Sequence, residues 1–482
     1  MAAIGDVAKI VGRKRVITDE GVLEEYKEDT SYVSGRMPRC VARPRNAKDV
    51  QKIVRLANKQ GSALVPCSSR GPRTRGDTVP EVDSAVVVDL SGMDSIVRMD
   101  KRNKAAMIEP GVSFGALQEA AEKEGLRVAM PLAPRRTKSV VGSLLEREPT
   151  TMPKVHWDMS DPLCCVEVIF GTGDLFRTGS AAGPGTLEQQ WASGQAQKSP
   201  MGPSQTDWVK IIQGAQGTMG IVTWASVKLE LKPQVEKAFF AGAEELGELT
   251  DFTYAIQRAK LADHCLILDR VNLGAILGGV PPRELPRWVL FYTISGYEHF
   301  PEERVAYIEQ DLRDMAGTMR REPGEALNGV SAQRLLSLVS RPSEEPYWKN
   351  RVSGGFQDIF FLTTLDRAPA FVRVMEAEAG KQGLSGEQLG CYLQPIQQGR
   401  GCHVEFTLLF DPTDAAQKAG VERAWFAASR ALSDAGAFFS RPYGPWSDLT
   451  YAKCPDTVTA LKKVKGILDP NRVMNPGKLC FQ

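Results

Sequence analysis

The stretch NAKDVQKIVRLANKQGSALVPCSSRG, residues 46–71, decides how the first part of this chain folds. Asn46 is a favoured N-cap, apolar residues recur at helical spacing as far as Ala57, and Gly61 can end the segment, which together predict an amphipathic helix. The run ALVPC that follows predicts a strand, and the polar CSSRG opens a loop of turn formers that reaches Pro80. This is the place in a mixed α/β domain where a nucleotide-binding loop would lie.

The segments that follow continue the alternation of strands and helices. Residues 85–90, AVVVDL, predict a second strand, and residues 105–128 predict a strand, a Pro-Gly turn, a helix capped by Ser113 and another strand. Residues 165–179 alternate around a Gly-Thr-Gly-Asp turn, which predicts a β-hairpin. The part of the chain up to about residue 232 therefore reads as mixed α/β.

Residues 234–454 predict a second α/β domain, because long helical patterns alternate there with strand-like runs. The Pro- and Gly-rich segment 180–206 predicts a surface loop, and the C-terminal segment predicts a short helix with two proline turns. The helical patterns lie at 301–317 and 414–436, and the strand-like runs at 287–296, 357–365 and 402–410.

Composition narrows the class of protein. The chain has 482 residues, of which 42% are hydrophobic and 24% charged, as in a globular protein of two or three domains. The formal net charge of +2 argues against a nucleic-acid-binding protein. No apolar run approaches the ~20 residues of a membrane helix, and Asp6 and Lys9 interrupt the N-terminal apolar stretch, so we expect neither a membrane span nor a signal peptide.

The nine cysteines are scattered and form no C-x-x-C pair. This pattern argues against an iron–sulfur cluster or a structural zinc site held by the chain itself. It also favours a reducing compartment, so we expect a cytoplasmic location.

Six segments, taken in their order, resemble the vanillyl-alcohol oxidase / p-cresol methylhydroxylase superfamily of FAD-linked oxidoreductases. The resemblance implies an α+β fold in two parts, a PCMH-type FAD-binding domain and an α/β cap domain that covers the flavin and forms the substrate pocket. We expect the FAD domain at 1–232, the cap at 233–454, and a C-terminal segment at 455–482 that returns to the FAD domain. The segments are PRNAKDV (44–50), VVVDLSGMDSIVRMD (86–100), IEPGVSFGALQ (108–118), VEVIFGTGDLFRTG (166–179), GAQGTMGIVT (214–223) and LDPNRVMNPGK (468–478).

The resemblance places the FAD pyrophosphate against the loop after the VP strand. Family members use glycines there, whereas this chain has Ser68, Ser69, Arg70 and Gly71. Serine hydroxyls and arginine can also bind phosphate oxygens, so we expect FAD to be retained, with loss of flavin binding as the open alternative. The other cofactor-binding residues that the resemblance implies are Pro110, Gly111, Gly142, Ser143, Asp161, Gly217, Gly220, Ile221 and Asn475.

The substrate side of the pocket departs from the family. The long loop is similar to the vanillyl-alcohol oxidase branch, in which a tyrosine and a Tyr-Arg pair hold a phenolate. On matching spacing, Arg75 takes the first tyrosine position, and Ser440 and Arg441 take the pair. Two guanidinium groups suit a carboxylate better than a phenolate, because arginine binds a carboxylate through two parallel hydrogen bonds.

His403 and Glu405 lie two residues apart on a predicted strand, so their side chains point to the same face. A histidine there could accept a substrate hydroxyl proton, although a hydrogen-bonded core histidine is an equal alternative. Two ligands on one strand are too few to predict a metal site, and the H-x-G-D-G-N-x-H segment of the glycolate/lactate branch is absent.

The leading hypothesis is an FAD-dependent dehydrogenase or oxidase that moves hydride from a small hydroxy acid or related alcohol to flavin N5. Oxidation of a para-substituted phenol is one alternative. A flavoprotein-like subunit of an electron-transfer complex, with degenerate flavin binding, is another. The partners expected are an anionic or aromatic small molecule and an iron–sulfur or cytochrome electron-transfer subunit, and a homo-oligomer remains open.

Overall fold

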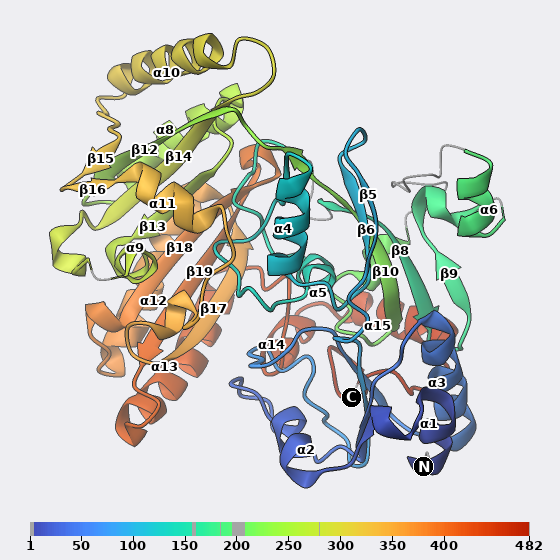
Figure 1. Ribbon diagram of the computed structural model, residues 1–482. Coiled ribbons are helices and arrows are strands. Elements are labelled where there is room, and N and C mark those ends of the chain that lie inside the picture. Colours follow the sequence, from blue (N-terminus) through green and yellow to red (C-terminus); the bar gives the residue numbers. More distant parts are fainter. Residues whose placement is uncertain (1–3, 157–160, 184, 195–207, 279, 482) are drawn as a thin grey trace.

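The computed structural model describes residues 4–156, 161–183, 185–194, 208–278 and 280–481 (Figure 1). In these residues three main sheets and the helices around them form an α+β protein, as the sequence predicts. The sheet built from the middle and later parts of the chain lies on the left of Figure 1, and the two N-terminal sheets lie on the right.

The first sheet has the strand order β1-β2-β4-β3, and β4 pairs in parallel with both β2 and β3. Helix α3 covers it with the apolar stripe predicted from the sequence, capped by Asn46 and ended by Gly61 at a φ of 61°. The C-terminal segment also adds to this sheet, since Asn475 N–H donates to Leu64 O at 2.8 Å. The elements are α1 (Ile4–Val11), β1 (Val16–Ile17), α2 (Glu20–Lys27), β2 (Cys40–Ala42), α3 (Ala47–Gln60), β3 (Leu64–Cys67) and β4 (Val86–Asp89).

The second sheet is antiparallel, with the order β5-β6-β10-β8-β9. The hairpin predicted at 165–179 is confirmed as β8 and β9, and the helix capped by Ser113 is confirmed as α4. Part of the segment 180–206 forms a short helix, α6, and part lies outside the described residues. The elements are β5 (Ile96–Asp100), β6 (Ala105–Ile108), α4 (Phe114–Lys123), β7 (Leu126–Arg127), α5 (Val140–Leu145), β8 (Leu163–Phe170), β9 (Leu175–Arg177), α6 (Leu187–Ala192), α7 (Val209–Ile212), β10 (Gly220–Lys228) and β11 (Glu230–Leu231).

The third sheet is antiparallel, with the order β12-β14-β13-β18-β19-β17. Alternate residues pack against its two helical layers: Ile267 joins the core under α8, α10, α12 and α13, whereas Leu266 joins the core under α9 and α11. The elements are β12 (Val235–Ala243), α8 (Gly247–Ala259), β13 (Cys265–Asp269), α9 (Arg270–Leu277), β14 (Trp288–Gly296), α10 (Pro301–Thr318), β15 (Ala326–Leu327), β16 (Val330–Ser331), α11 (Ala332–Val339), β17 (Gly355–Thr363), α12 (Ala368–Lys381), β18 (Leu389–Ile396), β19 (Gly401–Phe410) and α13 (Ala415–Asp434).

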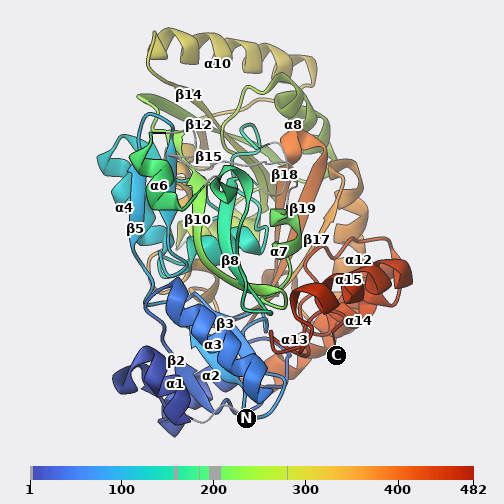
Figure 2. The same ribbon diagram turned by 90° about the vertical axis from the view of Figure 1, so that its right-hand side faces the viewer.

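The last two helices, α14 (Trp446–Tyr451) and α15 (Pro455–Leu468), bring the chain back from the third sheet to the N-terminal half. Figure 2 shows α13, α14 and α15 together on one side of the molecule. The exact boundaries at residues 232 and 454 stay predictions. Among the described residues, every helix is too short or too polar to cross a membrane.

Candidate active site

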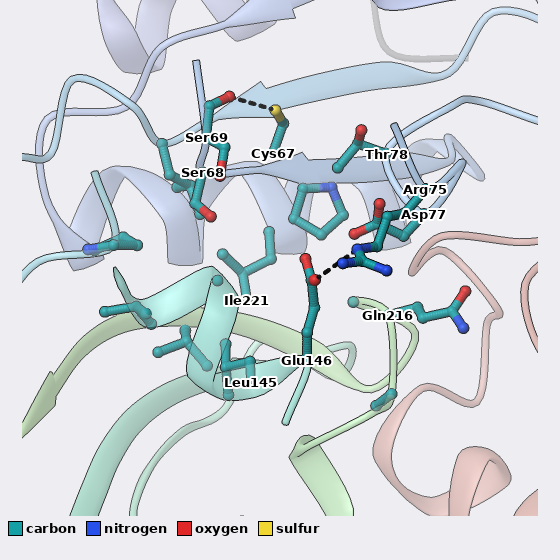
Figure 3. Close-up of a pocket in the computed structure, with 18 of the residues that line it drawn as sticks. Cys67, Ser68, Ser69, Arg75, Asp77, Thr78, Leu145, Glu146, Gln216 and Ile221 are labelled. Atoms are coloured by element: carbon teal, nitrogen blue, oxygen red, sulfur yellow. Dashed lines mark hydrogen bonds and ion pairs between the residues drawn. The ribbon is translucent and has the colours of Figure 1, made fainter. Parts of the chain in front are cut away.

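A cleft runs between the loop after β3, helix α5 and the segment that leads into β10 (Figure 3). Its empty volume, which includes space open to solvent, is about 1080 Å³. Seven residues predicted from the sequence to bind the cofactor line it, namely Ser68, Ser69, Pro110, Gly142, Gly217, Gly220 and Ile221.

The two serines stand close to the start of α5. Ser139 caps this helix, and its backbone N–H donates to Ser69 Oγ at 3.1 Å. A Cβ added to Gly142 would lie 2.9 Å from Ser68 Oγ, so the glycine allows the helix to approach the loop. The hydroxyls of Ser68 and Ser69 therefore lie in one wall of the cleft, where glycines would present only backbone.

Some buried polar side-chain atoms in the cleft have no hydrogen-bond partner among the described residues. Thr78 Oγ1 and Gln216 Oε1 are buried and make no hydrogen bond with the described residues, although both residues line the cleft. Buried polar atoms of this kind are normally satisfied, which indicates a polar ligand. The residues present therefore fit FAD, with Ser68 and Ser69 as the groups that would hold its pyrophosphate.

Six predicted cofactor residues lie outside the cleft lining, namely Arg70, Gly71, Gly111, Ser143, Asp161 and Asn475. Arg70 Nη2 lies 3.7 Å from Asp94 Oδ2 at the surface, and the neighbouring Gly71 is exposed. A Cβ on Gly111 would lie 2.6 Å from Ser91 O, so close packing of the backbone explains this glycine better than approach to a ligand. The expectation of ligand contact at these positions rested on their place in the motif, and the structure puts their neighbours in the cleft instead.

Ser143 and Asp161 also point elsewhere. The Ser143 hydroxyl donates to Glu148 Oε2 at 2.6 Å, which makes it a support for a charged cluster described below. Asp161 forms an ion pair with Lys228, at the opposite end of β10 from the cleft-lining Gly220. The spacing of Asp161 from the β8 strand therefore does not place it beside the cofactor.

Asn475 connects two walls of the cleft. Its Nδ2 donates to Asp77 O at 2.8 Å and to Gln216 O at 2.6 Å. Asp77 itself lines the cleft near Glu146 (Figure 3). Desolvation raises the pKa of Asp77 to about 7, and the neighbouring Glu146 adds to this shift. Asn475 is therefore a positioning residue for the cleft.

A second cavity, with an empty volume of about 650 Å³, adjoins the cleft, and both are lined by Thr74, Arg75, Arg135 and Lys138. We call it the acid cavity, because Arg75 and Arg441, the two residues predicted to bind a carboxylic acid, line it. All four residues predicted to be catalytic line the acid cavity, namely Arg75, His403, Glu405 and Arg441. The structure thus brings together residues that are more than 300 positions apart in the sequence.

The guanidinium groups of Arg75 and Arg441 both contact the ring of Phe360. Arg75 Cζ lies 4.5 Å and Arg441 Cζ 4.1 Å from the ring centroid, both at cation–π distance. Their electrostatic situations differ. Arg75 Nη2 lies 2.7 Å from Glu148 Oε1 and its Nε 3.5 Å from Glu146 Oε2, and these two carboxylates balance the charges of Arg75 and of Lys138, which pairs with both of them.

Arg441 has no such partner. Its side chain is 2% exposed, and its Nε and Nη1 make no hydrogen bond with any described residue. Burial, and then repulsion by Arg75, lowers its pKa. Since a guanidinium stays charged in proteins, this side chain is a buried cation that lacks an acceptor.

The charges of the acid cavity leave a small positive excess. Among the described residues, five cationic side chains line it, and three carboxylates do so. A fourth carboxylate, Glu146, lies 3.5 Å from Lys138 Nζ just outside, in the FAD cleft. The surplus is two positive charges within the cavity lining, or one when Glu146 is counted, and the cations without a carboxylate partner are Arg441 and Arg135, whose Nη1 also lacks a hydrogen bond.

His403 and Glu405 alternate on β19 and face the same cavity, as predicted. His403 Nε2 lies 3.5 Å from Glu405 Oε2. Lys349 holds the other oxygen, Glu405 Oε1, at 2.7 Å and also lies 2.7 Å from Asp358 Oδ1. Burial lowers the pKa of His403, so its ring is neutral at neutral pH and can accept a proton.

The sequence reasoning missed six charged residues of this site, namely Arg135, Lys138, Glu146, Glu148, Lys349 and Asp358. Glu146 and Glu148 follow α5. Lys349 lies before β17, and Asp358 lies within it. Their ion-pair partners are 9 to 73 positions away along the chain, so no helix or strand spacing reveals the pairs. The available signal was a single acid, Asp358, within the apolar run of a predicted strand, since such an acid needs a buried partner.

Comparison with known proteins agrees with this geometry. Residues 38–179 match the family model of an FAD binding domain, and residues 363–479 match that of the FAD linked oxidases, C-terminal domain. The D-2-hydroxyglutarate dehydrogenase of Stutzerimonas stutzeri is 24% identical over 99% of this chain and 98% of its own. The flavoprotein subunit of 4-cresol dehydrogenase (hydroxylating) of Pseudomonas putida is 24% identical over 64% of this chain and 57% of its own.

The fold is also found among solved structures. The crystal structure of p-cresol methylhydroxylase with substrate bound superimposes with a TM-score of 0.85, covering 99% of this chain and 96% of that chain at 16% identity. Both family models describe FAD proteins, so the comparisons favour an FAD enzyme over a subunit that has lost flavin binding. This chain belongs to the PCMH-type superfamily of FAD-linked oxidoreductases.

Proposed function

We propose that this FAD-linked oxidoreductase oxidises a small 2-hydroxy acid to the corresponding 2-oxo acid. The observation that carries the proposal is Arg441, a cation that is 2% exposed and has no acceptor among the described residues for its Nε and Nη1. A substrate carboxylate would supply two parallel acceptors for this guanidinium. The surplus of positive charge in the acid cavity suits a carboxylate substrate.

His403 is the proposed proton acceptor. It lines the same cavity as Arg441, and its lowered pKa keeps it neutral at neutral pH. A neutral imidazole can take the proton of the substrate hydroxyl as the C–O double bond forms. Glu405, held by Lys349, lies beside the ring and would stabilise its protonated form.

FAD supplies the acceptor for the hydride, that is, for two electrons and one proton. The protein's own groups do the remainder of the work. Arg441 orients the carboxylate, His403 takes the hydroxyl proton, and the shared lining of Thr74 and Arg75 brings the substrate carbon next to the cofactor cleft. The 2-hydroxy acid thus loses a hydride and a proton: the hydride would go to the cofactor, the proton to His403, and the product is a 2-oxo acid.

A para-substituted phenol is the second candidate substrate. It is favoured by the aromatic side chains of Tyr347, Trp348 and Tyr392, which line the acid cavity together with the charged groups. The cresol dehydrogenase relative also acts, by its name, on a phenol. A phenol binds as a neutral molecule or a phenolate, and it would leave the two donors of Arg441 less well satisfied than a carboxylate does.

The proposal includes an electron acceptor and a compartment. The reduced cofactor must be reoxidised by O2 or by an electron-transfer protein, an iron–sulfur protein or a cytochrome. No group of three or more His, Cys, Asp or Glu residues suited to a metal ion occurs among the described residues. We propose a cytoplasmic enzyme.

The test is reduction of the cofactor in the absence of oxygen. The purified chain is loaded with FAD, and its visible absorbance is followed after addition of a 2-hydroxy acid such as lactate or 3-phenyllactate, or of a 4-alkylphenol. Bleaching by the acids supports the proposal, and bleaching by the phenol alone supports the second candidate.

Arg441→Lys is the informative variant, since it keeps the charge but loses the two-pronged geometry. Unchanged kcat/KM for the acid in this variant would contradict the role of Arg441. Arg102→Lys, an exposed position in a turn, is the matched control and should behave as the parent protein.

A further inference from the structure

A third chamber, with an empty volume of about 480 Å³, adjoins both the FAD cleft and the acid cavity. Thr74 and Arg75 line all three spaces. Tyr443 lines the chamber and the cleft, and Phe356 lines the chamber and the acid cavity. The three spaces therefore border the same two residues, Thr74 and Arg75, and the proposed function places the reacting carbon of the substrate beside them.

Aromatic side chains form one part of the lining of this chamber, and polar or charged residues form another, namely Thr30, Ser31, Thr74, Arg75, Gln357 and Asp358. Trp425 and Trp446 stack with centroids 5.0 Å apart at an interplanar angle of 14°, and Phe360 meets Trp446 edge-on at 5.0 Å. The remaining aromatic lining residues are Tyr32, Phe356 and Tyr443.

The polar atoms of the two indoles are already satisfied by protein. Trp425 Nε1 donates to Asp358 O at 3.0 Å, and Trp446 Nε1 donates to Ser429 Oγ at 2.8 Å. The indoles therefore offer a ligand ring surfaces and edges rather than hydrogen bonds. Such surfaces prefer another aromatic ring, because offset and edge-to-face contacts add to the burial of apolar area.

The reacting carbon of a 2-hydroxy acid carries four groups, and three of them are assigned by the proposed function. The carboxylate lies at Arg441, the hydroxyl at His403, and the hydrogen toward the FAD cleft. We infer that the fourth group lies in the third chamber and is an aryl or arylmethyl group, so that the substrate is an aromatic 2-hydroxy acid. The inference rests on the proposed function and narrows its substrate class.

Aliphatic acids would use the same anchors but leave the chamber unfilled. Transfer of a phenyl ring from water to an apolar site favours binding by about 10- to 100-fold. The wild-type enzyme should therefore show a kcat/KM for 3-phenyllactate or mandelate about tenfold or more above that for lactate or glycolate.

A binding experiment tests the chamber without turnover. Quenching of tryptophan fluorescence is titrated with phenylacetate and with acetate, which share the carboxylate and differ in the ring. We expect phenylacetate to bind about tenfold or more tightly than acetate. Equal affinities would overturn the inference, whether or not either acid series reduces the cofactor.

Val33→Phe is the variant that separates the chamber from the anchors, because Val33 lines only the chamber among these spaces and a larger side chain fills it. We expect its kcat/KM for 3-phenyllactate to fall about tenfold or more while that for lactate stays within about twofold. The control Val97→Phe, at an exposed position of β5, should leave both values unchanged.

The two proposals fail in different ways. If lactate reduces the cofactor as well as 3-phenyllactate does and Val33→Phe affects both alike, the aromatic chamber is refuted and the hydroxy-acid function stands. If no hydroxy acid reduces the cofactor, the proposed function is refuted, and the comparison of phenylacetate with acetate still decides whether the chamber holds a ring.

Discussion

Replacing Arg441 by methionine should make the substrate-free protein more stable and the enzyme far less active. Arg441 is 2% exposed, its Nε and Nη1 have no acceptor among the described residues, and its charge is repelled by Arg75. Burying an ion costs several kcal/mol unless it is paired, and methionine fills a similar volume without a charge. The substitution loses the cation–π contact with Phe360, which is worth about 0.5–2 kcal/mol.

The balance favours the variant in the absence of substrate. We expect a gain of about 1–3 kcal/mol in the free energy of unfolding, by analogy with buried charges that are replaced by apolar side chains. The loss on binding is larger, because a substrate carboxylate would be buried without its partner at a cost of about 3–5 kcal/mol. This corresponds to a fall in kcat/KM of about two to three and a half orders of magnitude.

The assay pairs a thermal melt of the ligand-free protein with anaerobic reduction of the FAD-loaded enzyme by a 2-hydroxy acid. Arg102→Met, at an exposed turn, is the matched control and should change neither quantity. A lower melting temperature for Arg441→Met, together with retained turnover, would refute the view that Arg441 is an unpaired cation kept for an anionic substrate.

The remaining predictions concern the proton acceptor, its support and the cofactor cleft. His403→Gln should lower kcat by about 10²–10⁴-fold. In the parent enzyme burial lowers the pKa of His403, so as the pH is reduced kcat/KM should stay constant through pH 6.5, the ordinary pKa of histidine, and fall only at lower pH. A fall in kcat/KM centred at or above pH 6.5 would contradict this prediction. Lys349→Met leaves two buried carboxylates, one of them Glu405, without their cation, so the free energy of unfolding should drop by about 3–5 kcal/mol in a denaturation experiment, and an unchanged midpoint would refute the pairing. Gly142→Ala places a Cβ 2.9 Å from Ser68 Oγ and displaces that hydroxyl, so the Kd for FAD measured by flavin fluorescence should rise about tenfold, whereas unchanged affinity would show that Ser68 does not contact the cofactor.

Local signals in the sequence predict the elements well where a short segment contains its own start, stop and period. Helix α3 has its cap, stripe and terminating glycine within residues 46–61, and the β8–β9 hairpin has its turn between two alternating runs. The same kind of signal placed His403 and Glu405 on one face of a strand, because a period of two needs no knowledge of the tertiary structure.

The charge pattern of the site could not be predicted in this way. The ion pair of Arg75 with Glu148 joins positions 73 apart, and that of Lys349 with Glu405 joins positions 56 apart. The sequence therefore indicated that Arg75 and Arg441 face one pocket, but not that Arg75 is paired with carboxylates while Arg441 has no acceptor for its Nε and Nη1 among the described residues. One predicted cofactor residue, Gly111, matches the motif but lies outside the cleft lining, because its glycine is required by the packing of its own backbone against Ser91.

The loop after β3 links the three spaces of the site. Its first part places Ser68 and Ser69 in the FAD cleft, and its later part places Thr74 and Arg75 where cleft, acid cavity and aromatic chamber meet. Because two carboxylates balance the charges of Arg75 and Lys138, the Arg75 side chain adds little attraction for an anion. The Arg75 side chain instead forms a fixed part of the lining, because ion pairs hold it on one side and the ring of Phe360 contacts it on the other. A residue in that position sets which group of the substrate can turn toward the cofactor, so exchanges at Arg75 should change the choice of substrate more than the strength of acid binding.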